Sequence, residues 1–329
     1  MRQVLRRLLN VVKGFGLLTT LVEFIVRFST RQWRNSREIR NLIQKIDSEI
    51  SNNKLILQTQ RAAELVGDPL IYLDIGSRGG PQKITEGFSK IIHFVICEAD
   101  SDEVKNLQST FAECNFSIIN NAISDIEATR TLYLTASRGA SSLLKPTGNA
   151  IGLFGGNERN LDRFKIEHEV QIRTKPLSVS VPPEIKNIDI LKVDVQGMEF
   201  EVLSGMGELR PFLICAECST VEMYSGQKTL FSVGLMLEKL GYMPVKLMEI
   251  TVMPKTLVNF QSCIQIHGDV IFVPDNSARG RAIIERDVEK WFASLCMHGY
   301  MDFALWQIEE LKISKPPLVT ETEELLRNS

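Results

Sequence analysis

One stretch constrains this chain more than any other: the apolar run Leu70–Leu73, which ends in the acid Asp74 and is followed after Ile75 by Gly76-Ser-Arg-Gly79-Gly80. Such a run closed by glycines is typical of a buried parallel strand and its exit loop. In an open α/β sheet that exit lies at the carboxyl ends of the strands, where ligands bind. Asp74 would repel a pyrophosphate and favours a cationic ligand, such as the amino group and sulfonium of S-adenosylmethionine (SAM). The alternative is a tight strand-to-helix turn that binds nothing.

Further apolar runs of strand length follow, and helical patterns separate several of them. This alternation predicts an α/β fold whose strands pair in parallel through right-handed crossovers. Two runs with period two, Thr129–Thr135 and Glu169–Arg173, predict an inserted hairpin beside the site. The expected strands of the main sheet are 70–74, 91–97, 117–119, 188–194, 212–217, 245–247 and 269–273.

Acids stand at the tips of several of these strands. Glu98 follows the glycine loop by about twenty residues, the spacing at which a carboxylate accepts hydrogen bonds from ribose hydroxyls in SAM and NAD proteins alike. Asn121 follows the third strand and can reach an adenine edge, and Asp194 ends the fourth, where a methyl acceptor would enter. A single tip acid is often only a helix N-cap. Asp74, Glu98 and Asp194, with Glu217 as a fourth, together favour a site.

Composition narrows the class of protein. The net charge is −2, and no basic block with interleaved aromatics is present, so we expect no nucleic-acid partner. The six cysteines are scattered through apolar segments, as in a reduced cytosolic protein. Cys215 and Cys218 point to opposite faces of a strand, which argues against a disulfide. No strong metal-ligand spacing is found and we expect no metal, although Asp194 and Glu217 could together hold a divalent cation.

The two ends of the chain differ from its centre. Residues 1–66 form an amphipathic, coiled-coil-like helical pattern, and a membrane span is disfavoured because Lys13, Glu23 and Arg27 interrupt its apolar stretch. The protein is expected in the cytoplasm, and residues 1–60 are expected to pack on their own domain, to self-associate, or to lie peripherally at the inner membrane face. Residues 67–275 form the central domain, and 276–329 are expected to be a helical appendage.

The central region resembles the FkbM family of SAM-dependent methyltransferases over roughly residues 68–274. The resemblance implies a class I methyltransferase (Rossmann-like) fold, with a seven-stranded, mostly parallel sheet and an antiparallel last strand. It also implies transfer of a methyl group to a hydroxyl, often of a sugar, polysaccharide or polyketide product. The segments that carry it are Leu73–Gly79, Cys97–Ala99, Asn121–Asp125, Gly139–Leu143, Ile190–Gly205 and Asp269–Pro274.

The resemblance assigns roles to single residues. Glu98 would hold the ribose of SAM, Asn121 and Ala122 would flank the adenine, and Asp194 would lie next to the transferable methyl. The sequence departs from the family where Gln196 replaces its usual Glu, Met198 its usual Ala and Arg78 a common Asn. The residues that would hold the methionine part of SAM are Asp74, Gly76, Ser77 and Gly79.

Three questions stay open at the level of the sequence. The general base is expected to be Asp194 or His168, although a lone histidine in a strand is more often structural. Gln196 keeps open a catalytically inactive, methyltransferase-like scaffold in glycan assembly. An NAD-dependent oxidoreductase is a further alternative, but Asp74 stands where the first glycine of its G-x-G-x-x-G loop belongs. The predicted acceptor is a carbohydrate or another hydroxyl compound.

Overall fold

The computed structural model describes residues 68–76, 78, 91–110, 116–148, 162–247, 250–252 and 264–327. All of these belong to one compact unit, Ile56–Ser329. The predictions made for residues 1–66 lie outside the described residues, as do Ser77 and Gly79 of the glycine loop.

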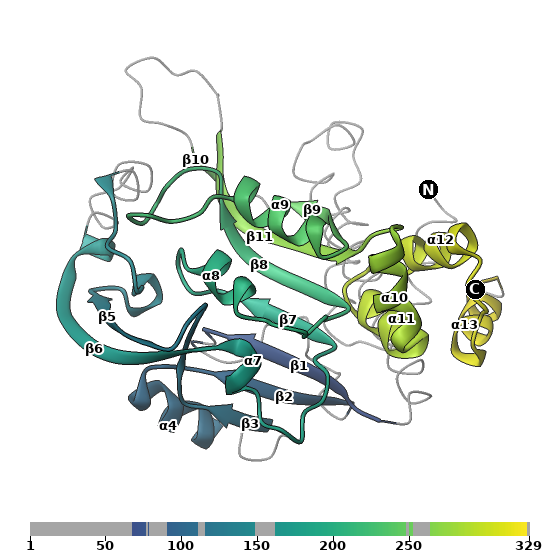
Figure 1. Ribbon diagram of the computed structural model, residues 1–329, viewed down its shortest axis with the longest axis horizontal. Coiled ribbons are helices and arrows are strands. Elements are labelled where there is room, and N and C mark those ends of the chain that lie inside the picture. Colours follow the sequence, from purple (N-terminus) through teal and green to yellow (C-terminus); the bar gives the residue numbers. More distant parts are fainter. Residues whose placement is uncertain are drawn as a thin grey trace, which may run out of the picture. The chain divides into compact units, whose positions relative to one another are not determined.

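The centre of this unit is an eight-stranded sheet with the order β10-β11-β8-β7-β1-β2-β3, in which β9 also pairs with β11 (Figure 1). β3, β2, β1, β7 and β8 are parallel, and β11 runs antiparallel to β8, β9 and β10. The bounds are β1 Leu70–Ile75, β2 Ile92–Cys97, β3 Phe116–Ile119, β7 Ile190–Val193, β8 Leu213–Ser219, β9 Tyr242–Leu247, β10 Ile250–Val252 and β11 Ile264–Pro274.

The expected fold class, a mostly parallel sheet closed by an antiparallel strand, is confirmed. Over the described residues the main sheet has eight strands where seven were expected, because β9 and β10 pair with successive parts of the long β11. β1, β2, β7 and β8 are almost entirely buried along their length. This burial on both faces is why they appear in the sequence as continuous apolar runs and not as alternating ones.

A second, three-stranded sheet has the order β4-β6-β5, from Ala122–Ser124, Ile166–Pro176 and Ala128–Thr135. β5 and β6 are antiparallel, which confirms the inserted hairpin predicted from the period-two runs. The parallel pairing of β4 with β6 was not predicted, because a three-residue strand leaves too short a pattern to detect. This sheet lies beyond the carboxyl ends of the main strands (Figure 1).

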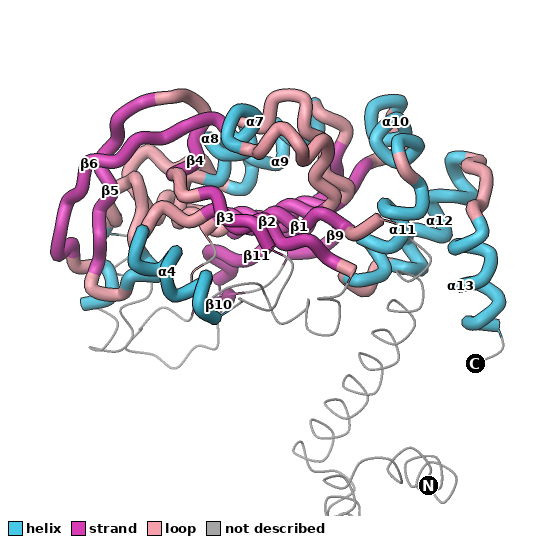
Figure 2. The backbone as a smooth tube through the Cα atoms, turned by 90° about the horizontal axis from the view of Figure 1, so that it is seen from below, coloured by secondary structure: helices cyan, strands magenta, loops and turns pink. Residues whose placement is uncertain are grey.

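Helices cover both faces of the main sheet. α4 (Ser101–Thr110) lies on one side, and α8 (Glu199–Ser204) and α9 (Leu230–Lys239) lie on the other (Figure 2). The core between these layers contains fully buried aromatic side chains, among them Tyr72 and Phe272.

Four further helices follow the sheet, α10 Ala278–Arg286, α11 Val288–Met297, α12 Met301–Leu311 and α13 Pro317–Arg327. Lys290 of α11 donates a hydrogen bond to the carbonyl of Pro69 at the start of β1 and pairs with Asp189 just before β7. These helices therefore pack at the amino ends of the strands, away from the ligand-binding edge. None of the helices in the described part of the chain is long and apolar enough to cross a membrane.

Candidate functional site

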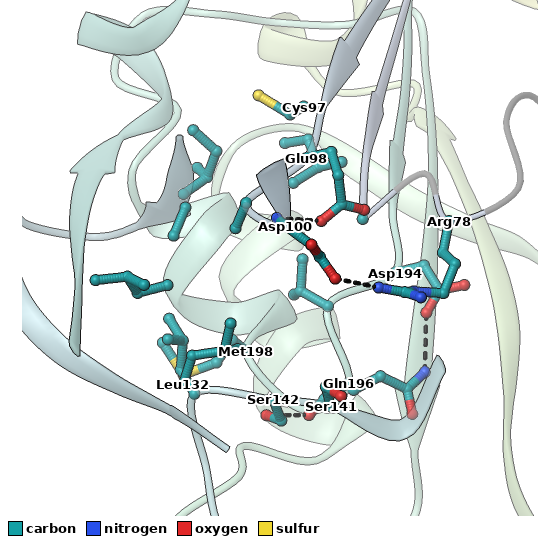
Figure 3. A pocket seen from close by; sticks show the side chains of 18 of the residues that line it. Arg78, Cys97, Glu98, Asp100, Leu132, Ser141, Ser142, Asp194, Gln196 and Met198 are labelled. Carbon is teal, nitrogen blue, oxygen red and sulfur yellow. Dashed lines mark hydrogen bonds and ion pairs between the residues drawn. The ribbon is translucent and has the colours of Figure 1, made fainter. Parts of the chain in front are cut away.

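A cavity of about 270 Å³, here called the main cavity, opens at the carboxyl ends of β1, β2 and β7 (Figure 3). Parallel pairing brings these strand ends to one edge, so residues far apart in the sequence meet there. The predicted site residues that line the main cavity are Gly76, Glu98, Asn121, Ala122 and Asp194.

The glycine loop packs directly against the end of β7. Gly76 has a φ of +83°, and a Cβ on it would come within 1.9 Å of the carbonyl oxygen of Asp194. The backbone N–H of Asp194 in turn donates to the carbonyl of Ile75 at 3.0 Å. Only glycine meets both demands, because it has no Cβ and tolerates positive φ.

Glu98 stands at the tip of β2 with 9% of its surface exposed. One of its carboxylate oxygens accepts the backbone N–H of Asp100 at 2.8 Å, and burial raises the pKa of the group. Arg78, at the departure from the family pattern, forms an ion pair of 2.8 Å with the Asp100 carboxylate (Figure 3). This pair joins the loops that follow β1 and β2 at the wall of the cavity.

Asp74 is not among the residues that line the main cavity. Its carboxylate is 1% exposed and lies 3.8 Å from the ammonium of Lys192, which lies 3.3 Å from the Asp194 carboxylate. Burial disfavours the charged ammonium, but Asp74 and Asp194 outweigh burial and raise the pKa of Lys192. Lys192 thus connects the buried acid of β1 to the acid at the cavity.

The same ammonium fixes the charge of Asp194. Burial favours its neutral form, but Lys192 and the amide of Gln196 outweigh burial and lower the pKa of Asp194. Asp194 is therefore an anion at neutral pH with a weakened affinity for protons. This suits the stabilisation of a nearby positive charge better than the removal of a proton.

The side chain of Gln196 connects Asp194, Glu217 and Tyr224 by hydrogen bonds. Its side-chain N–H₂ donates to Asp194 at 2.9 Å and also to Glu217, while its carbonyl accepts from the Tyr224 hydroxyl at 2.9 Å. A carboxylate only accepts hydrogen bonds, so the two acids fix which way the amide points. The residue is held at φ 55°, and the Ser142 hydroxyl donates to its backbone carbonyl. Left-handed backbone in a side-chain-bearing residue costs about 1–2 kcal/mol and often marks a functional site.

The remaining predictions fall elsewhere or stay predictions. His168 is exposed on β6 and is not among the residues that line the main cavity. In the described part of the chain, no group of three or more His, Cys, Asp or Glu side chains is arranged to hold a metal ion. Cys215 and Cys218 are both buried and free.

Sequence reasoning missed two residues of this network. Lys192 lies on β7 and Asp194 comes two positions later, directly after the strand ends, so both side chains point the same way, and this spacing was a usable signal. Tyr224 comes from an irregular loop after β8 and had no signal in the sequence.

The strand order and the cavity at the carboxyl edge define the class of protein. A parallel sheet in which one reversed strand, β11, lies between β8 and β9 is the class I methyltransferase architecture. The family model described as the methyltransferase FkbM domain matches residues 79–244. The chain belongs to the FkbM methyltransferase family, and its class of activity is SAM-dependent methylation.

Comparisons with single proteins are more distant, and a comparison with curated proteins found no match. Precorrin-6Y C5,15-methyltransferase from Geobacter metallireducens is 13% identical, with a TM-score of 0.32 over 66% of this chain and 87% of the other. The 1,6-didemethyltoxoflavin N1-methyltransferase from Burkholderia thailandensis, solved with S-adenosylhomocysteine (SAH), is 9% identical, with a TM-score of 0.29 over 72% and 85%. The assignment therefore rests on the family model and the strand order.

Proposed function

We propose that this protein transfers a methyl group from SAM to a hydroxyl oxygen of a sugar, a glycan or a related natural product. The observation that carries the proposal is the pair of carboxylates joined by Gln196: Asp194 at the main cavity and Glu217 beyond it. Carboxylates there accept hydrogen bonds from a hydroxyl acceptor. The FkbM resemblance adds that members often methylate hydroxyl groups of carbohydrates and polyketides.

The residues that line the main cavity fit SAM. SAM supplies a methyl group on a positively charged sulfur, and the cavity wall carries the acids Glu98, Asp100 and Asp194. In our proposal Glu98 accepts hydrogen bonds from the ribose hydroxyls, and Asn121 and Ala122 flank the adenine. The second sheet lends the cavity the apolar side chains Leu132, Leu134 and Ile172, which suit the face of an adenine ring.

The methionine part of SAM is assigned to the glycine loop, in which Gly76 lines the cavity and Ser77 and Gly79 lie outside the described residues. Asp74, which the resemblance also assigns to this part of SAM, supports the region through Lys192, because its carboxylate faces that ammonium. Asp194 would lie beside the methyl and stabilise the sulfonium. Positioning of the acceptor oxygen against the methyl supplies much of the barrier reduction in such displacements.

Calorimetry with SAH tests the cofactor site. Loss of a hydrogen bond to a charged group costs about 1.5–3 kcal/mol, so Glu98→Ala is expected to weaken SAH binding roughly 10- to 150-fold. Glu208→Gln, a change at an exposed glutamate, is the matched control and should bind like the wild type. Equal SAH affinity in all three proteins would contradict the site assignment.

Incubation with methyl-labelled SAM and extracted glycan fractions tests the reaction. The expected product carries the label on oxygen and gains one CH₂ in mass. Label on nitrogen or carbon would contradict O-methylation. SAH binding without labelling of any fraction would favour the inactive, methyltransferase-like scaffold.

A further inference from the structure

A second cavity, of about 30 Å³, shares Gln196 with the main cavity. A water needs at least about 10–15 Å³ of such space, so the second cavity admits a hydroxyl group but not a sugar ring. Phe164, Met223 and Tyr224 form its less polar walls, and Glu217 lines it together with His267.

Two neighbours, one in the loop after β7 and one on β11, hold the Glu217 carboxylate in place. One of its oxygens accepts from the Gln196 amide on the β7 side, and the other lies 3.3 Å from Nδ1 of His267 on β11. The Glu217 side chain is 20% exposed. The carboxylate is therefore oriented by two groups and still reachable from the second cavity.

Glu217 and Asp194 differ in their affinity for protons, although one amide bridges them. Lys192 beside Asp194 lowers the pKa of that acid, as shown above. Burial and the negative charge of Asp194 raise the pKa of Glu217, while the hydrogen bond with His267 opposes the rise. Two neighbouring carboxylates whose environments push their pKa values apart mark an acid–base assignment.

We propose that the second cavity receives the reacting hydroxyl of the acceptor and that Glu217 accepts its proton, with Gln196 and His267 as positioning residues. This inference rests on the proposed O-methyl transfer. It makes Glu217 a better acceptor for the hydroxyl proton than Asp194 or His168. The charged and titratable groups around Glu217 are Asp194, Glu199, Cys218, His267, Asp269, Tyr224 and Arg163.

The step balances within the site. The acceptor oxygen forms a bond to the methyl carbon, while the bond from that carbon to sulfur breaks and leaves its electron pair on sulfur. The hydroxyl proton moves to a carboxylate oxygen of Glu217, which becomes neutral. One positive and one negative charge thus disappear together, which is favourable in a buried, low-dielectric site.

Glu217→Gln keeps the shape of the side chain and removes its basicity. Methyl transfer to the glycan fraction labelled by the wild type is expected to fall about 10²- to 10⁴-fold, the usual contribution of a general base. The wild-type rate should rise with pH as Glu217 ionises, and this rise should be absent from the variant. SAH affinity should stay within about twofold of the wild type, as it should in the control Glu208→Gln.

Two further measurements separate proton transfer from structural support. In infrared difference spectra of the SAH complex, one titrating protonated carboxyl band of the wild type should be absent from Glu217→Gln, while the band of Glu199, whose pKa burial raises to about 8, should remain. His267→Gln should retain transfer but shift the pH at which the rate rises. If Glu217→Gln does not fold, Glu217→Asp is expected to keep the rise with pH at a reduced rate.

The outcomes distinguish this inference from the proposed function. A Glu217→Gln protein with the rate and pH profile of the wild type would overturn the inference and leave O-methyl transfer standing. Loss of SAH affinity in step with activity would overturn it too, because Glu217 would then serve the cofactor site. A wild-type protein that binds SAH and labels nothing would overturn both.

Discussion

The buried ammonium of Lys192 offers a quantitative test of how the site is held together. Its Nζ lies between Asp74, which is 1% exposed, and Asp194, which is 34% exposed. Lys192→Met keeps an unbranched side chain but leaves the Asp74 carboxylate buried without this cation. Breaking a buried ion pair by removing one partner costs about 3–5 kcal/mol.

Most of that cost should come from Asp74, because water can screen the partly exposed Asp194. A loss of 3–5 kcal/mol corresponds to a fall in the melting temperature of roughly 6–20 °C for a domain of this size. Urea unfolding followed by circular dichroism should show a lower midpoint with an unchanged slope. Lys186→Met, at an exposed lysine just before β7, is the matched control and should leave the midpoint unchanged.

The double variant Asp74→Asn/Lys192→Met gives the decisive comparison. It removes the negative charge that Lys192→Met leaves without its lysine, so it should be more stable than Lys192→Met by about 1–3 kcal/mol, the usual penalty when a buried polar group loses a partner. A double variant less stable than Lys192→Met would refute the idea that the ammonium neutralises Asp74.

Three further predictions concern Gly76, Glu199 and Gln196, which lie around the carboxylates of the site. Gly76→Ala should lose about 1–3 kcal/mol of stability to backbone strain, besides its clash with the Asp194 carbonyl, and calorimetry should show weakened SAH binding. Burial raises the pKa of Glu199 to about 8. The folded state therefore binds more protons than the unfolded state from roughly pH 4.5 to 8, and the free energy of unfolding should fall as pH rises through this range. Glu199→Gln should flatten that slope in urea titrations at several pH values. Gln196→Glu should destabilise the protein by roughly 1–3 kcal/mol at neutral pH, since two carboxylates lose their donor, and added Mn²⁺ should restore the melting temperature.

The sequence was most informative where backbone geometry alone decides position. Parallel strands deliver their tips to one edge, so placing Glu98, Asn121 and Asp194 in strand order was enough to predict that they meet. The need for glycine at position 76 could be predicted for the same reason, because its loop must pass close to the carboxyl end of β7. These parts of the site follow from strand periodicity and glycine conformation.

The Gln196 network could not be predicted in this way. It depends on a left-handed φ at Gln196 and on the pairing of β11, which sets His267 across from β8. Both depend on tertiary structure and leave no periodic pattern in the sequence. Asp74 shows what local reasoning leaves out: a strand-tip acid suggests a direct ligand contact, and only the register shows that this carboxylate also faces Lys192 across the sheet.

The replacement of the family's glutamate by Gln196 makes physical sense in this network. A carboxylate here would face Asp194 and Glu217 at hydrogen-bond distance, and three neighbouring acids cannot all be ionised without a cation in addition to Lys192. An amide instead donates to both acids and lets them keep different affinities for protons. The substitution therefore does not argue for a dead site. In the proposed reaction it separates Asp194, which Lys192 holds as an anion and which we place beside the methyl donor, from Glu217, which we propose takes the proton of the acceptor.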